Sequence, residues 1–200
     1  MLGHETEIKL KVPNPRATKR KLASLGFARA GQRHFERNLL FDFPDLRLRK
    51  ARSVLRLRFE SGRSLVTFKG APLDSPGYKV RREIETEVKD GRRLKEAFEA
   101  LGFREFFRYE KYRTKYAIQA PRKASHSRST NPSGEMVYDE TPIGNFIELE
   151  GPKRWIDALA RRLGYGRDEY ITDSYVALYL KNCAEQGQKP ANMVFPKSRK

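Results

Sequence analysis

The chain has 200 residues, enough for one sizeable hydrophobic core. Its 42 Lys and Arg residues outnumber its 25 Asp and Glu residues, and the formal net charge of +17 favours an anionic partner. The single cysteine, Cys183, excludes an intrachain disulfide and a cysteine-rich zinc site. The N-terminus lacks an apolar signal core, and no apolar run approaches the roughly 18 residues that a membrane-spanning helix needs. We therefore expect a cytoplasmic protein without membrane contact.

The first predicted element is a strand over residues 4–12, where apolar and charged side chains alternate. Asn14 predicts a helix N-cap with Pro15 at the first helical position, and Gly26 predicts the end of that helix. Similar alternation, or β-branched and aromatic composition, predicts the later strands. We expect them over residues 34–42, 54–60, 64–69, 78–88 and 106–118, and over the two runs 136–139 and 145–150.

Three further helices are predicted from capping residues and helical spacing. Asp90 caps the first of them, which ends at Gly102. The second opens at Pro152 and runs to Gly164. Asp173 is the expected cap of the last helix.

At least five of the predicted strands carry charged side chains at alternate positions, with like signs grouped. One charged face is ordinary for an antiparallel sheet with one side in water. A solvated face, however, usually also carries Ser, Thr, Gln and Asn. The basic positions are Lys9, Arg56, Arg58, Lys69, Arg81, Lys111 and Arg113, and the acidic positions are Glu5, Glu7, Glu83, Glu85, Glu148 and Glu150.

We therefore expect an α+β fold in which an antiparallel sheet closes into a barrel, with the charged faces inside and helices over the apolar faces. Burying bare charges is costly, so water, a polyanion and metal ions should complete the neutralisation. Arg and Lys bind phosphate oxygens. Two Glu residues at positions i and i+2 of a strand lie about 6.5–7 Å apart on one face. This spacing suits hard cations such as Mg²⁺ or Mn²⁺, which also bridge to phosphates.

These segments resemble the CYTH, or triphosphate tunnel, superfamily, which contains class IV adenylyl cyclases, thiamine triphosphatases and inorganic triphosphatases. Glu5-Thr6-Glu7-Ile8-Lys9 matches its ExExK signature. The segments that resemble the rest of the family's pattern, in order, are HFERNLLFD, VLRLRFE, VTFKG, VRREIE, EKYRTKY, DETPIGNFIELEG and SYVALYL. The pattern is nearest to the bacterial class IV cyclases. The resemblance implies a single domain over residues 1–181, built as a closed eight-stranded antiparallel barrel with a charged interior and helices packed outside.

The resemblance also implies roles for individual residues. Glu5, Glu7, Glu148 and Glu150 are the implied metal ligands, with Glu85 and Asp139 as further candidates. Triphosphate binding is assigned to Lys9, Arg56, Arg58, Lys69, Arg81, Lys111 and Arg113, among which Lys9 and Lys111 are the catalytic candidates. Glu83 and Glu85 could instead satisfy neighbouring arginines. Tyr175 is expected to pack the last helix rather than to reach the substrate.

The implied cofactor is Mg²⁺ or Mn²⁺, and the implied ligand is ATP, tripolyphosphate or thiamine triphosphate. Attack by water on the γ-phosphate would make the protein a triphosphatase. Attack by a ribose 3′-hydroxyl on the α-phosphate would release pyrophosphate and a cyclic nucleotide. Two alternatives remain: a non-catalytic binding module for polyphosphate, and a nucleic-acid-binding protein with its basic residues on an outer face.

Two segments are polar and basic, with too little apolar surface to offset the entropy of ordering. We expect residues 119–134 to form a flexible loop and residues 182–200 to form a flexible tail. Both could add weak, non-specific binding to nucleic acid. The expected oligomeric state is a monomer or a homodimer.

Overall fold

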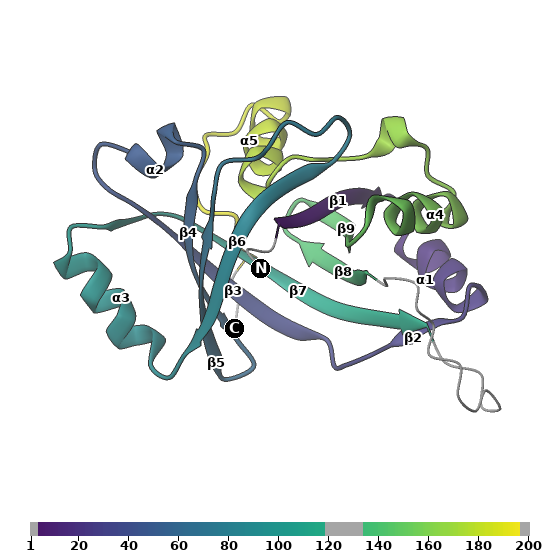
Figure 1. The fold of residues 1–200 in the computed structure, drawn as a ribbon, viewed down its shortest axis with the longest axis horizontal. Helices are drawn as coiled ribbons and strands as arrows, with labels where there is room; N and C mark the ends of the chain where they lie inside the picture. Colours follow the sequence, from purple (N-terminus) through teal and green to yellow (C-terminus); the bar gives the residue numbers. More distant parts are fainter. Residues whose placement is uncertain (1–3, 119–133, 197–200) are drawn as a thin grey trace.

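The fold is a closed β-barrel, seen in a computed structural model that describes residues 4–118 and 134–196 (Figure 1). Its strands are β1 (His4–Val12), β2 (Phe27–Arg29), β3 (His34–Asp42), β4 (Val54–Glu60), β5 (Arg63–Lys69), β6 (Lys79–Val88), β7 (Arg104–Ile118), β8 (Glu135–Thr141) and β9 (Gly144–Glu150). They form one antiparallel sheet in the order β2-β7-β3-β4-β5-β6-β1-β9-β8. An additional pairing of β7 with β8 closes the last eight strands of this order into a barrel, and β2 extends β7 outside it. The predicted eight-stranded antiparallel barrel is thus confirmed.

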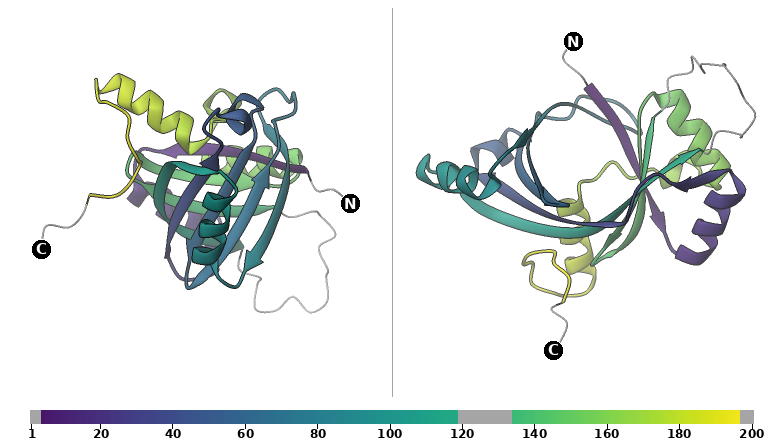
Figure 2. Two further views of the ribbon diagram at one scale, coloured as in Figure 1. Left: turned by 90° about the vertical axis from the view of Figure 1, so that its left-hand side faces the viewer. Right: turned by 90° about the horizontal axis from the view of Figure 1, so that it is seen from below.

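Helices cover the outside of the barrel. They are α1 (Pro15–Ser24), α2 (Arg47–Lys50), α3 (Gly91–Ala100), α4 (Lys153–Leu163) and α5 (Tyr175–Glu185). Helices α1 and α4 lie side by side over β1, β8 and β9, whereas α3 lies at the opposite end of the molecule (Figures 1 and 2). No helix in the described ranges is long and apolar enough to cross a membrane.

The two faces of each strand have opposite environments. On β1, Ile8 and Leu10 are fully buried in a cluster with Leu22 of α1 and Ile156 of α4. A second cluster packs outer side chains of β3 and β4, such as Phe41, against α3. Apolar burial at about 1.5–3 kcal/mol per large side chain therefore holds the helices on the barrel. The alternate, charged side chains are left to face the interior.

Local residue chemistry explains most element boundaries. The Asn14 side chain accepts a hydrogen bond from the Ala17 amide at 3.0 Å, as predicted for the start of α1. Asp90 accepts from the amides of Arg92 and Arg93, both at 3.0 Å, which starts α3.

The start of α5 differs from the prediction. Ser174, and not Asp173, is the cap: its hydroxyl oxygen accepts from the Ala177 amide at 3.2 Å. Asp173 instead pairs with Lys181 at 2.6 Å. Both residue types are good caps, so the sequence alone could not choose between adjacent positions.

The two short runs after residue 134 form a hairpin. β8 and β9 pair from Glu135 opposite Glu150 to Thr141 opposite Gly144. The Thr141 hydroxyl donates to the Gly144 carbonyl oxygen at 2.7 Å, and Gly144 has φ +123°. Glycine adopts this left-handed conformation at little cost, which explains the sharp turn.

The segment after α5 makes more contacts than its composition predicts. The Glu110 amide donates to the Met193 carbonyl oxygen at 2.9 Å, and the Met193 amide donates to the Arg108 carbonyl oxygen at 3.0 Å. Met193 is fully buried in the cluster that contains Phe107 and Tyr109. Up to residue 196 the tail therefore packs on β7. The loop expected over 119–134 lies outside the described residues, apart from Gly134.

Candidate functional site

The barrel encloses a cavity of about 290 Å³ whose wall is mostly charged. Each residue that the sequence assigned to the site lines it, except Asp139. The charged lining consists of Glu5, Glu7, Lys9, Arg56, Arg58, Lys69, Lys79, Arg81, Glu83, Glu85, Lys111, Arg113, Glu135, Glu148 and Glu150.

Two of the four predicted metal ligands lie where carboxyl groups crowd together, with Lys69 3.8 Å from Glu5. The register places Glu7 opposite Glu150 across β1 and β9. Burial, a hydrogen bond to Glu83 and repulsion by Glu150 raise the pKa of Glu5 to about 9. Burial and repulsion by Glu7 raise the pKa of Glu150 to about 7. Carboxyl groups with pKa values raised in this way mark a place where a cation would be stabilising. Oxygen-ligated Mg²⁺ or Mn²⁺ fits this donor set.

The other two predicted ligands are already ionised. Burial opposes the charge on Glu7, yet Lys9 and Lys79 hold its pKa well below the usual range. Lys79 donates to Glu7 at 2.6 Å. Burial likewise opposes the charge on Glu148, but Lys111 and Arg113 lower its pKa. Glu7 and Glu148 therefore offer carboxylate oxygens without first losing a proton.

The arginines of β4 are held by a carboxylate on β6. Arg56 donates to Thr67 at 3.0 Å and to Glu85 at 3.2 Å. Arg58 donates to both oxygens of Glu85 at 3.2 Å. Of the two roles left open for Glu85, the contacts support the one in which it satisfies these arginines. Held in this way, two guanidinium groups face the cavity in fixed positions.

Arg81 on β6 has no such partner. It is 6% exposed, and its Nη2 donates to the Arg52 carbonyl oxygen at 3.2 Å. Within residues 4–118 and 134–196, no carboxylate oxygen lies within 4.0 Å of its guanidinium nitrogens, and its Nε has no hydrogen-bond partner. Burial lowers its pKa. The carboxylates that act on Arg81, chiefly those of Glu7 and Glu83, lie farther than 4.0 Å from it, which leaves its guanidinium group able to bind an anion.

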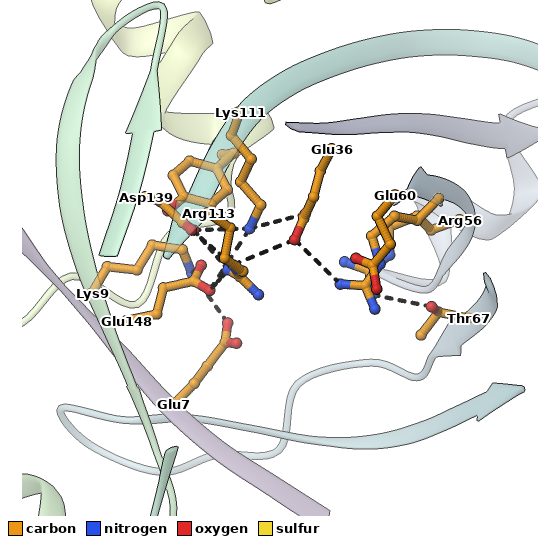
Figure 3. A network of polar contacts seen from close by, with 12 residues as sticks. Glu7, Lys9, Glu36, Arg56, Glu60, Thr67, Lys111, Arg113, Asp139 and Glu148 are labelled. Atoms are coloured by element: carbon orange, nitrogen blue, oxygen red, sulfur yellow. Dashed lines mark hydrogen bonds and ion pairs between the residues drawn. The ribbon is translucent and has the colours of Figure 1, made fainter. Parts of the chain in front are cut away.

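Asp139 faces cations rather than the cavity (Figure 3). It is fully buried, and its carboxylate accepts from Lys111 Nζ at 2.8 Å, Arg113 Nε at 2.7 Å and Tyr175 Oη at 2.8 Å. The expected metal-binding role is not what these contacts support, because they occupy the acceptor positions. Asp139 is instead placed to orient Lys111 and Arg113.

Three further positions in or beside the cavity wall were missed in the sequence. Tyr175 was expected only to pack, but it lines the cavity. Lys79 also lines it, and burial lowers its pKa to about 8. Glu36 is fully buried and lies 3.5 Å from Lys111 and 3.6 Å from Arg113. The sequence did contain a signal for Glu36, which lies two residues before Asn38 on the face of β3 opposite the apolar Leu39 and Phe41. A single acidic residue in an aromatic strand is, however, weak evidence for a site.

A larger cavity of about 700 Å³ adjoins the first and shares Val54, Lys79 and Arg81 with it. Its remaining wall mixes apolar and basic side chains, which are Arg49, Arg52, Leu73, Phe106 and Leu180 among others. The charged cavity thus continues into a space suited to a less polar group.

Known proteins share this architecture. A protein of Methanocaldococcus jannaschii named as a candidate adenylate cyclase is 28% identical over 184 residues, which cover 87% of this chain and 97% of that protein. A solved structure of a candidate adenylate cyclase from Vibrio parahaemolyticus is 17% identical with a TM-score of 0.73, covering 89% of this chain and 98% of its own. A candidate adenylyl cyclase from Hippeastrum, described as having a dominant triphosphatase activity, is 20% identical with a TM-score of 0.58, covering 93% and 97%. At these identities the two structural matches establish the fold.

The family model for the CYTH domain matches residues 3–175, a span that includes β1 to β9 and α1 to α4 and ends at the first residue of α5. The chain therefore belongs to the CYTH domain family.

Proposed function

We propose that this protein is a metal-dependent enzyme that binds a triphosphate inside the barrel and either hydrolyses or cyclises it. One observation carries the proposal: a single cavity holds Arg81, which has no carboxylate within 4.0 Å among the described residues, and the carboxyls of Glu5 and Glu150, whose pKa values are raised. Arg81 needs an anion, whereas Glu5 and Glu150 need a cation. A triphosphate with a divalent metal supplies both.

The basic side chains would position the phosphates. Arg56, Arg58 and Arg81 come from neighbouring regions of the wall and present guanidinium groups suited to phosphate oxygens. Phosphoryl transfer requires of a protein mainly positioning and stabilisation of charge, and a fixed cationic wall provides both.

Lys9 and Lys111 would stabilise charge on the reacting phosphate, and Lys9 would act as a fixed positive charge rather than as a base. Lys9 is 2% exposed, and although burial opposes its charge, Glu7 and Glu148 raise its pKa above the usual range. Lys111 is also 2% exposed and donates to Asp139. Lys9 therefore keeps its proton, and both side chains are placed to stabilise the negative charge that develops on the reacting phosphate.

Glu5, Glu7, Glu148 and Glu150 would hold Mg²⁺ or Mn²⁺. When bound, such an ion neutralises phosphate charge and lowers the pKa of the attacking group. The activity assay below also compares Mg²⁺ with Mn²⁺.

The adjoining 700 Å³ cavity favours a substrate with an organic group beyond its phosphates, such as ATP or thiamine triphosphate, over tripolyphosphate. The names of the relatives are consistent with either reaction: the Methanocaldococcus jannaschii protein is named as a candidate cyclase, and the Hippeastrum protein is described as mainly a triphosphatase.

The test is product analysis with ATP, thiamine triphosphate and tripolyphosphate, each with Mg²⁺ or Mn²⁺. Cyclic AMP with pyrophosphate would identify a cyclase, and orthophosphate would identify a triphosphatase. Activity should be lost in Glu7→Gln/Glu148→Gln and kept in Glu87→Gln, a matched control at an exposed glutamate of β6. Tight tripolyphosphate binding without turnover of any substrate would leave only a binding module.

A further inference from the structure

A second group of metal-binding side chains lies where β3 begins and β4 ends. Glu36 is directly opposite Glu60 in the register of these strands, and His34 is two residues before Glu36 on the same face. His34 Nε2 is 3.4 Å from Glu36 Oε1 and 3.9 Å from Glu60 Oε2. The three potential ligand atoms all lie within 4.8 Å of one another. None of the three residues lines the charged cavity.

The imidazole of His34 is oriented like that of a metal ligand. Its Nδ1 is 3.3 Å from the Gln32 carbonyl oxygen, so Nδ1 is assigned as the donor and carries the proton. Nε2 then presents its lone pair to the two carboxylates. Metal-binding histidines commonly donate their other N–H to a backbone carbonyl in this way.

Glu36 points into this group with unused acceptors. Its side chain is fully buried, and within the described residues neither of its oxygens has a hydrogen-bond partner. The nearest cationic nitrogens, on Lys111, Arg113 and Arg58, are 3.5, 3.6 and 3.9 Å away. These three ion pairs stabilise the charge on Glu36, but none of them is a hydrogen bond, so its oxygens keep acceptor positions that a metal ion could use. Figure 3 shows Glu36 between Glu60 on one side and Asp139 with Lys111 and Arg113 on the other.

We propose that His34, Glu36 and Glu60 form a second metal site, separate from the four glutamates of the cavity, that binds a first-row transition ion such as Zn²⁺. The distances from His34 Nε2 are near the roughly 3.4 Å that separates two ligands of a tetrahedral Zn²⁺ with bonds of about 2.0–2.1 Å. The imidazole nitrogen selects for Zn²⁺ over Mg²⁺, which prefers oxygen alone. Three protein ligands leave a position for water.

An ion at this site would share Glu60 with Arg58. Arg58 Nε lies 3.1 Å from Glu60 Oε2, and the same guanidinium reaches Glu85 and lines the charged cavity. The second site therefore adjoins the proposed phosphate-binding wall through a single arginine.

Zn²⁺ titration by calorimetry in excess Mg²⁺ tests the proposal, because Mg²⁺ occupies sites made only of oxygen ligands. We expect one Zn²⁺ per chain in the wild type, with affinity weakened by more than about 100-fold in His34→Asn and in Glu60→Gln, since loss of a direct ligand costs at least as much as loss of a second-shell partner. His4→Asn removes an exposed histidine of β1 and should leave the affinity unchanged. Thermal unfolding of each variant without zinc verifies that it is folded.

A spectroscopic signature separates a ligand from a structural neighbour. X-ray absorption at the zinc edge should show imidazole scattering in the wild type and in His4→Asn, and should lose it in His34→Asn. Equal Zn²⁺ affinity in wild type and His34→Asn, or zinc without imidazole scattering in the wild type, would overturn the proposal and leave His34 as a neighbour of Glu36 only.

Discussion

Tyr175 of α5 donates a 2.8 Å hydrogen bond to Asp139 of β8 inside the barrel. The same carboxylate accepts from Lys111 and Arg113, and the Tyr175 ring centroid lies 5.2 Å from the amino nitrogens of both Lys9 and Lys111. A helix packed outside the strands thus holds the cations of the proposed active site in place.

Tyr175→Phe tests this link. The ring keeps its contacts with Tyr109 and Phe146, but the hydrogen bond to a buried carboxylate is lost. We expect the free energy of unfolding to fall by about 1.5–3 kcal/mol in urea denaturation. Tyr165→Phe, which loses a bond to the neutral Lys11 carbonyl oxygen, should cost only about 0.5–1.5 kcal/mol. Equal losses in the two variants would show that Asp139 does not depend on Tyr175.

Arg81→Met should weaken ligand binding while sparing or increasing stability. The substitution removes a buried charge that has no carboxylate partner within the described chain, and Met fills similar space. We expect the Kd for tripolyphosphate to rise roughly 10- to 100-fold in calorimetry, with Tm unchanged or higher. Arg82→Met, at an exposed neighbour on β6, is the control. A large decrease in Tm in Arg81→Met would mean that Arg81 stabilises the fold rather than serving to bind an anion.

Much of this architecture follows from alternation in the sequence. In β1, the apolar side chains of Ile8 and Leu10 pack against helices, which leaves Glu7 and Lys9 to face the interior. The same two-residue alternation on β4 places Arg56 and Arg58 in the cavity wall. The partners across the barrel could not be predicted in this way. The contact of Asp139 with Tyr175 depends on where α5 docks, and the lack of a carboxylate within 4.0 Å of Arg81 in the described chain depends on register between strands. No local pattern encodes either.

Metal binding should release protons. At pH 7 the metal-free protein holds a proton on Glu5, whose pKa is raised to about 9, and is half-protonated at Glu150, whose pKa is about 7. Mn²⁺ displaces these protons, so its affinity should increase as the pH rises from about 6 to 8. Calorimetry in buffers of different ionisation enthalpy measures the number released. Zero release at pH 7 would show that Glu5 is already ionised.

Glu5 and Glu150 also determine whether the stability of the metal-free protein rises or falls with pH. Their folded pKa values exceed the unfolded value of 4.5, so the folded metal-free protein binds more protons than the unfolded chain above that pH. Their contribution is complete below about pH 4.5 and is lost as the pH rises through about 7 for Glu150 and about 9 for Glu5, so we expect Tm to fall over this range without metal. Saturating Mn²⁺ should reverse the trend, and a pH-independent Tm in both states would contradict it.

Glu5→Gln and Glu148→Gln should differ although both residues are proposed metal ligands. Glu5 is protonated near neutral pH, so the amide replaces a neutral group and metal-free stability should change by less than about 0.5 kcal/mol. Glu148 is ionised and lies within 4.0 Å of Lys9, Lys111 and Arg113. Its replacement breaks buried ion pairs and should cost about 3–5 kcal/mol in urea denaturation. Equal costs would show that the two carboxyls share one environment.

The most direct test of the barrel interior as a triphosphate and metal site is a crystal structure with tripolyphosphate and Mn²⁺, with manganese located by its anomalous scattering. We expect manganese among Glu5, Glu7, Glu148 and Glu150, and phosphate oxygens against Arg56, Arg58 and Arg81. Phosphate bound only to basic side chains outside the barrel, with manganese absent from the glutamates, would contradict the proposed function.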